Sequence, residues 1–371
     1  MLSILHILNK YDLTQGGPPR AVNNIFSILK KKKIKTYLIS TLNNNSHQTK
    51  NKYIGRNIIK RFSVPDLNFI LHLRKKIKEY DIIHIHCMWN IITTLSFFLA
   101  RFYKKKIIFS PHGTLERKNL TKNLLLKKLY YYLFEKRNIK NIDLIHFLSK
   151  EEKINSNYLN TKNYFISSNG LNFDEFIFKK KYKTNIFNKN KFNILNIGRF
   201  NKIKGLDLQL ELIKKLNEKV DNYRLIFIGP NDDQKNLYKK KVKIMKISKY
   251  VKFLPPIFSN KRFKIMHDSN LVINTSYYEC NSMTILEALT SGALVLAVDK
   301  ANVNHQSKYN ALIKTKRNLL DICNNVELLR NNKKLQKRIR NNGINYAKKY
   351  LDTNITIKNY LNQYIKVSKL K

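Results

Sequence analysis

Short apolar runs alternate with longer segments of helical periodicity along nearly the whole chain. This alternation is typical of parallel sheets whose strands are joined by crossover helices. In the first half, the apolar runs predict strands at Ser3–Leu8, Thr36–Ser40, Ile82–His86, Lys106–Ser110, Leu144–Leu148 and Tyr164–Ile166. The periodic segments predict helices at Ala21–Lys31, Phe69–Glu79, Thr93–Tyr103, Thr121–Arg137 and Lys150–Tyr158. The last of these helices follows Ser149-Lys-Glu-Glu152, a capping-box sequence that marks a helix start.

A second alternating set follows a polar, lysine-rich stretch. Its predicted strands are Phe192–Ile197, Tyr223–Ile228, Val251–Leu254, Leu271–Asn274 and Ala293–Val298. Its predicted helices are Leu206–Leu216, Gln234–Ile247, Asn260–Asp268 and Met283–Thr290. Beyond Leu319, Leu and Ile recur at three- and four-residue spacing, which predicts helices to the end of the chain.

The length of 371 residues exceeds one ordinary domain and fits two. The stretch from Phe178 to Lys191 has few apolar and many charged residues, which is typical of a linker. We therefore predict an α/β protein with Rossmann-like domains at residues 1–173 and 192–350, joined by a linker at 174–191. Residues 351–371 are predicted to form a separate terminal helix.

The composition is strongly basic, with 72 Lys and Arg against 24 Asp and Glu and a net charge of +48. One explanation is attraction to a polyanion or to an anionic membrane surface. The other is codon drift, because Asn, Ile and Tyr are abundant together with Lys along the whole chain. Drift explains the Asn and Ile excess, which a binding patch would not, and the two explanations are compatible.

The cysteines and the apolar stretches of the sequence indicate the cellular compartment. Cys87, Cys280 and Cys323 are far apart, which argues against a disulfide framework or a zinc site and suits a reducing cytosol. The apolar start of the chain lacks a basic region and a cleavage site, so it is predicted to be a strand rather than a signal peptide. The longest apolar stretch, Ile91 to Ala100, is too short to span a bilayer. We therefore expect a cytoplasmic protein without a transmembrane segment.

Two carboxylates follow a predicted buried strand in the second half, Glu279 in a polar loop and Glu287 on the next helix. Ligands of open parallel sheets bind at the carboxyl ends of strands, where such loops lie. The residues between them would present backbone N–H groups at a helix start, a ready site for phosphate oxygens. These residues are Asn281, Ser282, Met283 and Thr284.

A cationic group follows the first strand of the second half, in the pairs Gly198-Arg199 and Lys204-Gly205. Two cations in the loop after a strand can bind an anionic group such as a phosphate. Arg provides a bidentate fork and Lys a point charge. The chain has no Asp-x-Asp motif to hold a divalent metal, because Asp232 and Asp233 are adjacent in a polar loop.

Two further candidates lie in the first half. Gly16 and Gly17 join the first strand to the first helix, and paired glycines allow a backbone to approach a ligand closely. The loop lacks the spacing of a dinucleotide or Walker motif, and Arg20 at its end is a weaker candidate. His112 sits at the carboxyl end of a strand, where function is favoured over packing.

These groups together resemble the family-4 retaining glycosyltransferases, which have the GT-B fold of two Rossmann-like domains that face a cleft. The resemblance implies that Glu279 approaches the transferred sugar, that Glu287 binds the ribose, and that Arg199 and Lys204 bind the diphosphate. It also implies that Gly16, Gly17 and His112 face the cleft and that a terminal helix, Leu351–Leu370, crosses back to the first domain. Here Cys280-Asn281-Ser282 replaces the family's glycine-aromatic-glycine run, which leaves the sugar preference open.

The implied activity is transfer of a hexose from a UDP- or GDP-sugar to a hydroxyl of a lipid-linked or cell-envelope saccharide, such as a lipopolysaccharide or another polysaccharide precursor. Retention of anomeric configuration, the absence of a metal and the absence of a cofactor are expected with it. The basic surface suggests peripheral contact with the inner, anionic face of the cytoplasmic membrane. A sugar epimerase or an inactive relative of the same fold is the alternative. A nucleic-acid-binding protein, suggested by charge alone, lacks a recognisable module.

Overall fold

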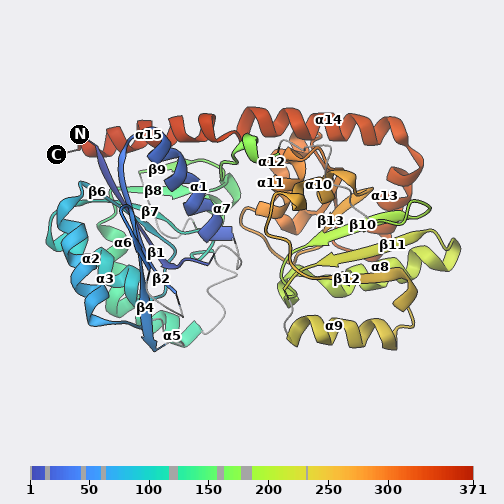
Figure 1. Ribbon diagram of the computed structural model, residues 1–371, viewed down its shortest axis with the longest axis horizontal. Coiled ribbons are helices and arrows are strands. Elements are labelled where there is room, and N and C mark those ends of the chain that lie inside the picture. The colour runs from blue at the N-terminus through green and yellow to red at the C-terminus, as the bar shows by residue number, and fades with distance from the viewer. Residues whose placement is uncertain are drawn as a thin grey trace. The chain divides into compact units, whose positions relative to one another are not determined.

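The computed structural model describes residues 2–12, 17–42, 47–59, 64–116, 124–156, 163–176, 186–230 and 233–370. The chain forms two compact units. The N-terminal unit comprises residues 1–170 together with 353–371, and the C-terminal unit comprises residues 171–352. Figure 1 shows a β-sheet flanked by helices in each unit. Half of the predicted linker, residues 177–185, lies outside the described residues.

The N-terminal unit is built on a nine-stranded sheet, counted over the described residues, of order β3-β4-β2-β1-β6-β7-β8-β9, with β5 paired to β4. Its strands are β1 Ser3–Lys10, β2 Lys35–Leu42, β3 His47–Thr49, β4 Lys52–Ile59, β5 Val64–Pro65, β6 Ile82–His86, β7 Lys106–Ser110, β8 Leu144–Phe147 and β9 Tyr164–Ile166. The central strands β1 and β6 are buried over most of their lengths, and both combine isoleucine or leucine with buried histidines.

Helices cover both faces of this sheet. They are α1 Gly17–Lys31, α2 Leu67–Glu79, α3 Ile91–Phe102, α5 Leu124–Tyr130, the π-helical turn η1 Tyr131–Glu135, α6 Lys136–Lys140, α7 Lys150–Asn155 and α15 Thr353–Ser368. One core contains residues of α2 and α3, whereas another contains residues of α1 and α15. The terminal helix α15 therefore packs on the N-terminal sheet, to which Tyr360 and Tyr364 contribute fully buried rings.

The C-terminal unit has a parallel sheet of order β12-β11-β10-β13-β14-β15 among its described residues. The strands are β10 Phe192–Ile197, β11 Tyr223–Ile228, β12 Val251–Leu254, β13 Leu271–Asn274, β14 Val295–Val298 and β15 Ile313–Thr315. The chain first winds from β10 outward to β12, and then starts again at β13 on the other side of β10. In sheets of this kind, ligands bind outside the carboxyl ends of the strands at such a reversal, which here are the ends of β10 and β13.

The helices of this unit complete its single core. They are α8 Leu206–Lys219, α9 Asp233–Ile244, α10 Lys261–Asp268, α11 Met283–Thr290, α12 Asn304–Lys308, α13 Leu319–Asn331 and α14 Lys333–Tyr350. Short 3₁₀ turns are η3 Phe173–Phe176, η4 Lys202–Lys204, η5 Ser248–Tyr250 and η6 Asp299–Ala301. In the part of the chain that is described, none of the helices combines the length and the apolar character that crossing a bilayer requires.

The predicted α/β class with two parallel sheets is confirmed, and most predicted elements lie within a few residues of the observed ones. Four strands were not predicted, namely β3, β4, β5 and β15, of which β4 and β15 are the most informative. The strand β4 mixes Lys, Gly, Arg and Asn with its apolar residues, and β15 is only three residues long. The strands β4 and β15 are extended because they pair with β2 and β14, and local sequence does not reveal this pairing.

Candidate active site

The candidate site residues of the C-terminal unit lie beyond two adjacent strands. β10 ends at Ile197 and leads into the loop that carries Arg199 and Lys204, whereas β13 ends at Asn274 and leads into the loop that carries Glu279. These strands pair directly where the strand order reverses. The sheet topology therefore brings together two loops that are far apart in the sequence.

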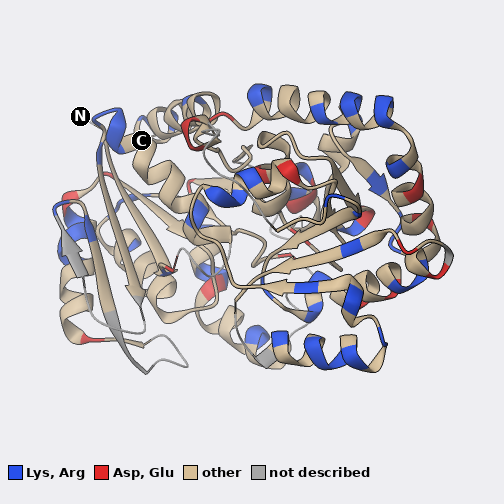
Figure 2. Ribbon diagram, turned by 45° about the vertical axis from the view of Figure 1, so that its right-hand side comes forward, with Lys and Arg blue, Asp and Glu red and all other residues tan. Residues whose placement is uncertain are grey.

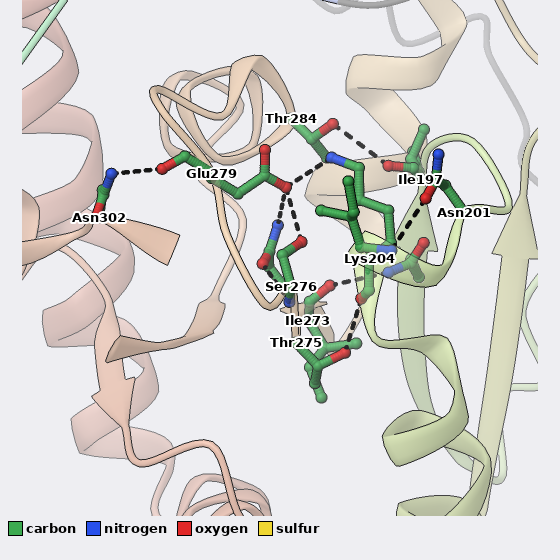
Figure 3. A network of polar contacts seen from close by, with 12 residues as sticks. Ile197, Asn201, Lys204, Ile273, Thr275, Ser276, Glu279, Thr284 and Asn302 are labelled. Atoms are coloured by element: carbon green, nitrogen blue, oxygen red, sulfur yellow. Dashed lines mark hydrogen bonds and ion pairs between the residues drawn. The ribbon is translucent and has the colours of Figure 1, made fainter. Parts of the chain in front are cut away.

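Lys204 and Glu279 form an ion pair between these loops, as Figure 3 shows. Nζ of Lys204 lies 2.6 Å from Oε1 of Glu279. The Lys204 side chain is 27% exposed and that of Glu279 is 12% exposed, so the pair is shielded from bulk water on most sides. An ammonium group has three hydrogens, and one bond to Glu279 leaves two for a further anion.

Neighbouring polar groups hold the Glu279 carboxylate in place. Oε1 also accepts a hydrogen bond from Ser276 Oγ at 2.7 Å and one from Asn274 Nδ2 at 3.3 Å. The backbone carbonyl of Glu279 accepts from the side-chain amide of Asn302, which follows β14. All the side-chain bonds from described residues go to Oε1, which leaves the lone pairs of Oε2 for a ligand. Asn302 has a φ of 53°, a conformation that Asn tolerates better than most residues.

The backbone at position 205, directly after Lys204, requires glycine. Its φ is +61°, and a Cβ placed on it would lie 2.3 Å from the carbonyl oxygen of Thr275. Only glycine fits such an approach of two backbones. Thr275 Oγ1 bonds the carbonyls of Lys204 at 3.2 Å and Gly205 at 2.9 Å, which ties the two loops together. The packing therefore fixes Lys204 beside the end of β13.

The start of α11 provides the backbone donors that the sequence predicts. Ser282 precedes the helix and makes no side-chain capping bond, so the first N–H groups of the helix are left without an intrahelical partner. Thr284 Oγ1 donates to the carbonyl of Ile197 at the end of β10, which links the helix to the first loop. Met283 is buried and Asn281 is half-buried. Helix starts of this kind favour anions, and the predicted phosphate contact of this one stays a prediction.

Glu287 has a partner that the sequence analysis did not predict. Its buried carboxylate accepts two hydrogen bonds from the guanidinium of Arg262 on α10. Nη2 lies 3.3 Å from Oε1, and Nε lies 3.5 Å from Oε2. Arg262 also donates to the carbonyl of Phe258 and stacks on the ring of Phe263, 4.0 Å from its centroid. The predicted ribose contact of Glu287 stays a prediction.

Arg199 is the exposed member of the group. It follows β10 directly, and within the described residues its guanidinium pairs with no carboxylate. A cation in this state is available to an incoming anion.

His112 lies in the N-terminal unit, in a tight turn after β7. His112 and Gly113 both have positive φ, 49° and 78°. The buried carboxylate of Glu152 secures this turn by accepting from the N–H of Gly113 and from that of Leu148, both at 2.6 Å. In the predicted capping box, Ser149 Oγ does accept from the N–H of Glu152, but the Glu152 carboxylate is used for the His112 turn instead.

The remaining predicted residues of the N-terminal unit are at the start of α1. Gly17 is the first residue of this helix, and Arg20 lies in its first turn. Gly16 lies outside the described residues. The sequence analysis missed Asn302 and Arg262 and gave Glu152 only a capping role, because each acts through a contact between elements that are distant in the chain.

Comparison with known proteins places the chain in a family. A model of the group 1 glycosyl transferases matches residues 178–346. A model of glycosyltransferase family 4 matches residues 16–156. The chain belongs to the group 1 and family 4 glycosyltransferases, as the resemblance of its motifs predicted.

Individual relatives are distant. An uncharacterized 41.2 kDa protein in a cps region of Klebsiella pneumoniae is 27% identical over 243 residues, and the match covers 62% of this chain and 63% of the relative. This chain thus spans less than two thirds of the length of that relative.

Solved structures show the fold. Sucrose-phosphate synthase from Thermosynechococcus elongatus has a TM-score of 0.77 at 14% identity, covering 99% of both chains. HepE of Anabaena, in complex with UDP and glucose, also has a TM-score of 0.77 at 14% identity, covering 99% of this chain and 100% of HepE. The architecture is that of the GT-B glycosyltransferases, which confirms the predicted fold class.

Proposed function

We propose that this protein transfers a hexose from a nucleoside-diphosphate sugar to a hydroxyl group of a saccharide acceptor, with retention of anomeric configuration. The single observation that carries the proposal is the Lys204–Glu279 pair at the point of strand reversal. It combines a cation for a diphosphate with a carboxylate for a sugar in the crevice where ligands bind in this class of sheet.

The diphosphate would bind between Lys204, Arg199 and the start of α11. When the bond between the anomeric carbon and the phosphate oxygen breaks, the diphosphate takes the electron pair and its negative charge grows. The ammonium of Lys204 has two further hydrogens for these oxygens, and the backbone N–H groups add their dipoles. These fixed positive groups would supply the stabilisation that a divalent metal supplies elsewhere, so we propose that transfer requires no metal.

Glu279 would contact the transferred sugar through Oε2, while Oε1 stays bound to Lys204 and Ser276. Retention by a covalent intermediate requires a nucleophilic carboxylate with a second carboxyl close by. Among the described residues of the C-terminal unit, Glu279 is bonded to cationic and neutral groups, not to a second acid. We therefore favour a same-face reaction in which the leaving phosphate accepts the proton of the acceptor hydroxyl.

The comparisons support a nucleotide-sugar donor and a polysaccharide acceptor. HepE, which has the same fold, binds UDP and glucose, so UDP-glucose is the first donor to test. A relative in a cps region supports an acceptor that is a precursor of a cell-envelope polysaccharide, free or linked to a lipid. A GDP-sugar donor and a lipopolysaccharide acceptor remain within the same proposal.

A lipid-linked acceptor would bring the protein to a membrane. One exposed segment has the composition expected for contact with a membrane surface. The segment 124–134, which forms α5 and η1, exposes Leu125 by 84%, Leu126 by 64% and Leu133 by 63%. Lys128 on this segment and Lys136 just after it are also exposed. Apolar side chains beside cations are typical of segments that lie on an anionic bilayer. We propose that segment 124–134 rests on the inner leaflet of the cytoplasmic membrane.

The distribution of positive charge does not favour a nucleic-acid-binding function. Figure 2 shows Lys and Arg spread over many elements of both units rather than gathered on one helix or strand. A nucleic-acid-binding module concentrates its cations on one face.

The experiment that tests the proposed function is a panel of UDP- and GDP-sugars, assayed for release of the nucleoside diphosphate with and without EDTA. We expect release with at least one donor, unaffected by EDTA, and retention of configuration by proton NMR of the product. Conversion of the sugar into an epimer would favour the epimerase instead. Absence of binding and turnover with every donor would contradict the proposal.

A further inference from the structure

A chain of three imidazoles runs through the sheet of the N-terminal unit and ends at His112. Nδ1 of His6 lies 3.0 Å from Nε2 of His86, and Nδ1 of His86 lies 3.0 Å from Nε2 of His112. His6 belongs to β1 and His86 to the adjacent β6, whereas His112 follows β7 on the other side of β6. Both contacts are at hydrogen-bond distance, so each needs one N–H and one lone pair.

The rings are neutral at ordinary pH. Burial lowers the pKa of His6 and of His112 to about 3, and that of His86 well below its usual value. A neutral imidazole has one N–H and one bare nitrogen, so no ring can donate through both nitrogens. Only two proton arrangements then satisfy both contacts: every ring is protonated on Nδ1, or every ring is protonated on Nε2.

The inner end of the chain selects between these arrangements. Nε2 of His6 is buried and has no hydrogen-bond partner among the described residues. If the rings were protonated on Nε2, this end would bury an N–H group without an acceptor. Buried N–H groups without a partner are rarer in native proteins than acceptors without one. Protonation on Nδ1 leaves a bare nitrogen at the inner end and is therefore favoured.

We propose that His6 and His86 are positioning residues that hold His112 with its proton on Nδ1. Nδ1 is the ring nitrogen of His112 that takes no part in the chain. Because His86 donates to Nε2 of His112, the imidazole of His112 is fixed in both orientation and tautomer. The outer end of the chain is then a preorganised N–H donor.

His84 belongs to a separate network on the same strand. Its Nδ1 lies 2.7 Å from the hydroxyl of Tyr364 on α15, and its Nε2 lies 2.7 Å from Ser110 Oγ. Ring nitrogens of His6, His84 and His86 lie within 4.8 Å of one another, a spacing that could hold a metal ion. An ion would have to break these hydrogen bonds and those of the chain, so the hydrogen-bonded arrangement is favoured.

The consequence concerns the role of His112 and rests on the proposed function. With its proton on Nδ1, His112 donates a hydrogen bond to an oxygen of the bound sugar nucleotide, either a hydroxyl or a phosphate oxygen. It does not act as a general base, because its bare nitrogen already accepts from His86. The opposite tautomer would leave Nδ1 bare and would make His112 a base.

The direct test is NMR of the full-length protein with ¹⁵N-labelled histidine rings, near neutral pH. Long-range ¹H–¹⁵N couplings separate the two tautomers, and single variants of His6, His86 and His112 assign the signals. We expect Nδ1–H for all three rings. Nε2–H on His112, or a charged ring, would overturn the proposal, and so would a metal bound in stoichiometric amount to His6 and His86.

A variant pair adds a kinetic test. Asn at position 6 can still donate a hydrogen bond to His86, whereas Leu cannot. We expect His6→Leu to lower kcat about tenfold or more, with a smaller effect on KM, because His86 and His112 lose their fixed tautomer. His6→Asn should retain more activity, although Leu suits a buried site better than Asn. Equal kcat losses in both variants would overturn the proposal.

A matched control is His72→Leu, because His72 on α2 contacts Tyr37 and Tyr53 and lies outside the chain of imidazoles. It should leave kcat unchanged. The NMR result does not depend on turnover, so it decides the tautomer even if His6→Leu fails to fold. If the wild-type protein transferred no sugar at all, the proposed function would be contradicted. The tautomer measured by NMR would still test the proposal on His6 and His86.

Discussion

Nζ of Lys204 lies 2.6 Å from Oε1 of Glu279, across 75 positions of sequence. Each residue belongs to the loop after one of two adjacent strands, at the point where the strand order reverses. The ammonium of Lys204 and the carboxylate of Glu279 neutralise each other in this pair. In the proposed complex, the first would contact the diphosphate and the second the sugar. The pair therefore keeps both side chains oriented before the donor binds.

Replacement of Lys204 by Met should lower kcat about 100-fold or more, because loss of one preorganised positive donor costs about 3 kcal/mol of barrier. The Met side chain has a similar length without the charge. Steady-state kinetics with the donor found in the sugar-nucleotide panel would measure this loss. The control is Lys202→Met, since Lys202 lies on the same short turn and is exposed. Similar kcat values for both variants would remove Lys204 from the site.

Replacement of Arg262 by Met should lower the free energy of unfolding by about 3 kcal/mol or more, because it leaves the Glu287 carboxylate buried without its charged partner. The side chain of Glu287 is only 4% exposed in this pair. The double variant Arg262→Met with Glu287→Leu should recover much of that stability, since a buried ion pair is often replaceable by apolar groups. Urea unfolding measures both changes.

The same double variant separates the structural role of Glu287 from its proposed role in ribose binding. If Glu287 holds the ribose, the double variant should be stable and yet bind the nucleoside diphosphate at least about tenfold more weakly, by the loss of a charged hydrogen bond. Isothermal titration with UDP or GDP measures the affinity. Wild-type affinity in the stable double variant would show that Glu287 serves only the fold.

Binding to anionic vesicles should depend on segment 124–134. The triple variant Leu125→Ser, Leu129→Ser and Leu133→Ser removes apolar side chains that are 84%, 58% and 63% exposed, so it should float far less with phosphatidylglycerol vesicles at low salt. High salt should weaken wild-type binding too, because each basic residue near the surface adds about 1 kcal/mol of attraction.

The matched control is Leu237→Ser with Ile244→Ser on the lysine-rich helix α9, where these side chains are 49% and 79% exposed. This variant should float like the wild type. Equal loss of flotation in both variants would indicate general charge attraction, and failure of the wild type to bind would contradict the proposed membrane contact.

Acidification should destabilise the N-terminal unit well above the usual pH range of carboxylate protonation. Burial lowers the pKa of His6 to about 3 and that of His146 to about 4, from a usual value of 6.5. The unfolded chain therefore binds more protons than the folded one as the pH falls below 6.5. Stability from these histidines is fully present above that pH and is lost toward pH 3, by about 1.4 kcal/mol per pH unit for each ring.

Urea unfolding at pH 7.5, 6.5 and 5.5 measures this dependence. The variant His6→Leu removes one of the titrating rings, so its stability should fall less steeply between pH 6.5 and 5.5 than that of the wild type. A stability that is constant over this interval in the wild type would contradict the neutral, buried state of the histidines.

Periodicity predicted the helix Met283–Thr290 and the strand Leu271–Asn274 with the observed bounds, because both segments are apolar and flanked by polar residues. It did not predict β4 or β15, whose sequences lack a clear apolar period and whose strand structure depends on pairing with neighbours. The predicted helix at Lys150–Tyr158 ends earlier, at Asn155, where local periodicity does not decide a helix end.

The sequence by itself determined the α/β class and the loops that carry Arg199, Lys204 and Glu279, since these depend on residue type and local order along the chain. Only the tertiary structure decided that Lys204 pairs with Glu279, that Arg262 covers Glu287, and that His6 and His86 lead to His112. Each of these contacts joins elements that the sheet topology brings together. Sequence spacing carries no information on distances between side chains from separate strands, whereas the order of strands in a sheet sets those distances directly.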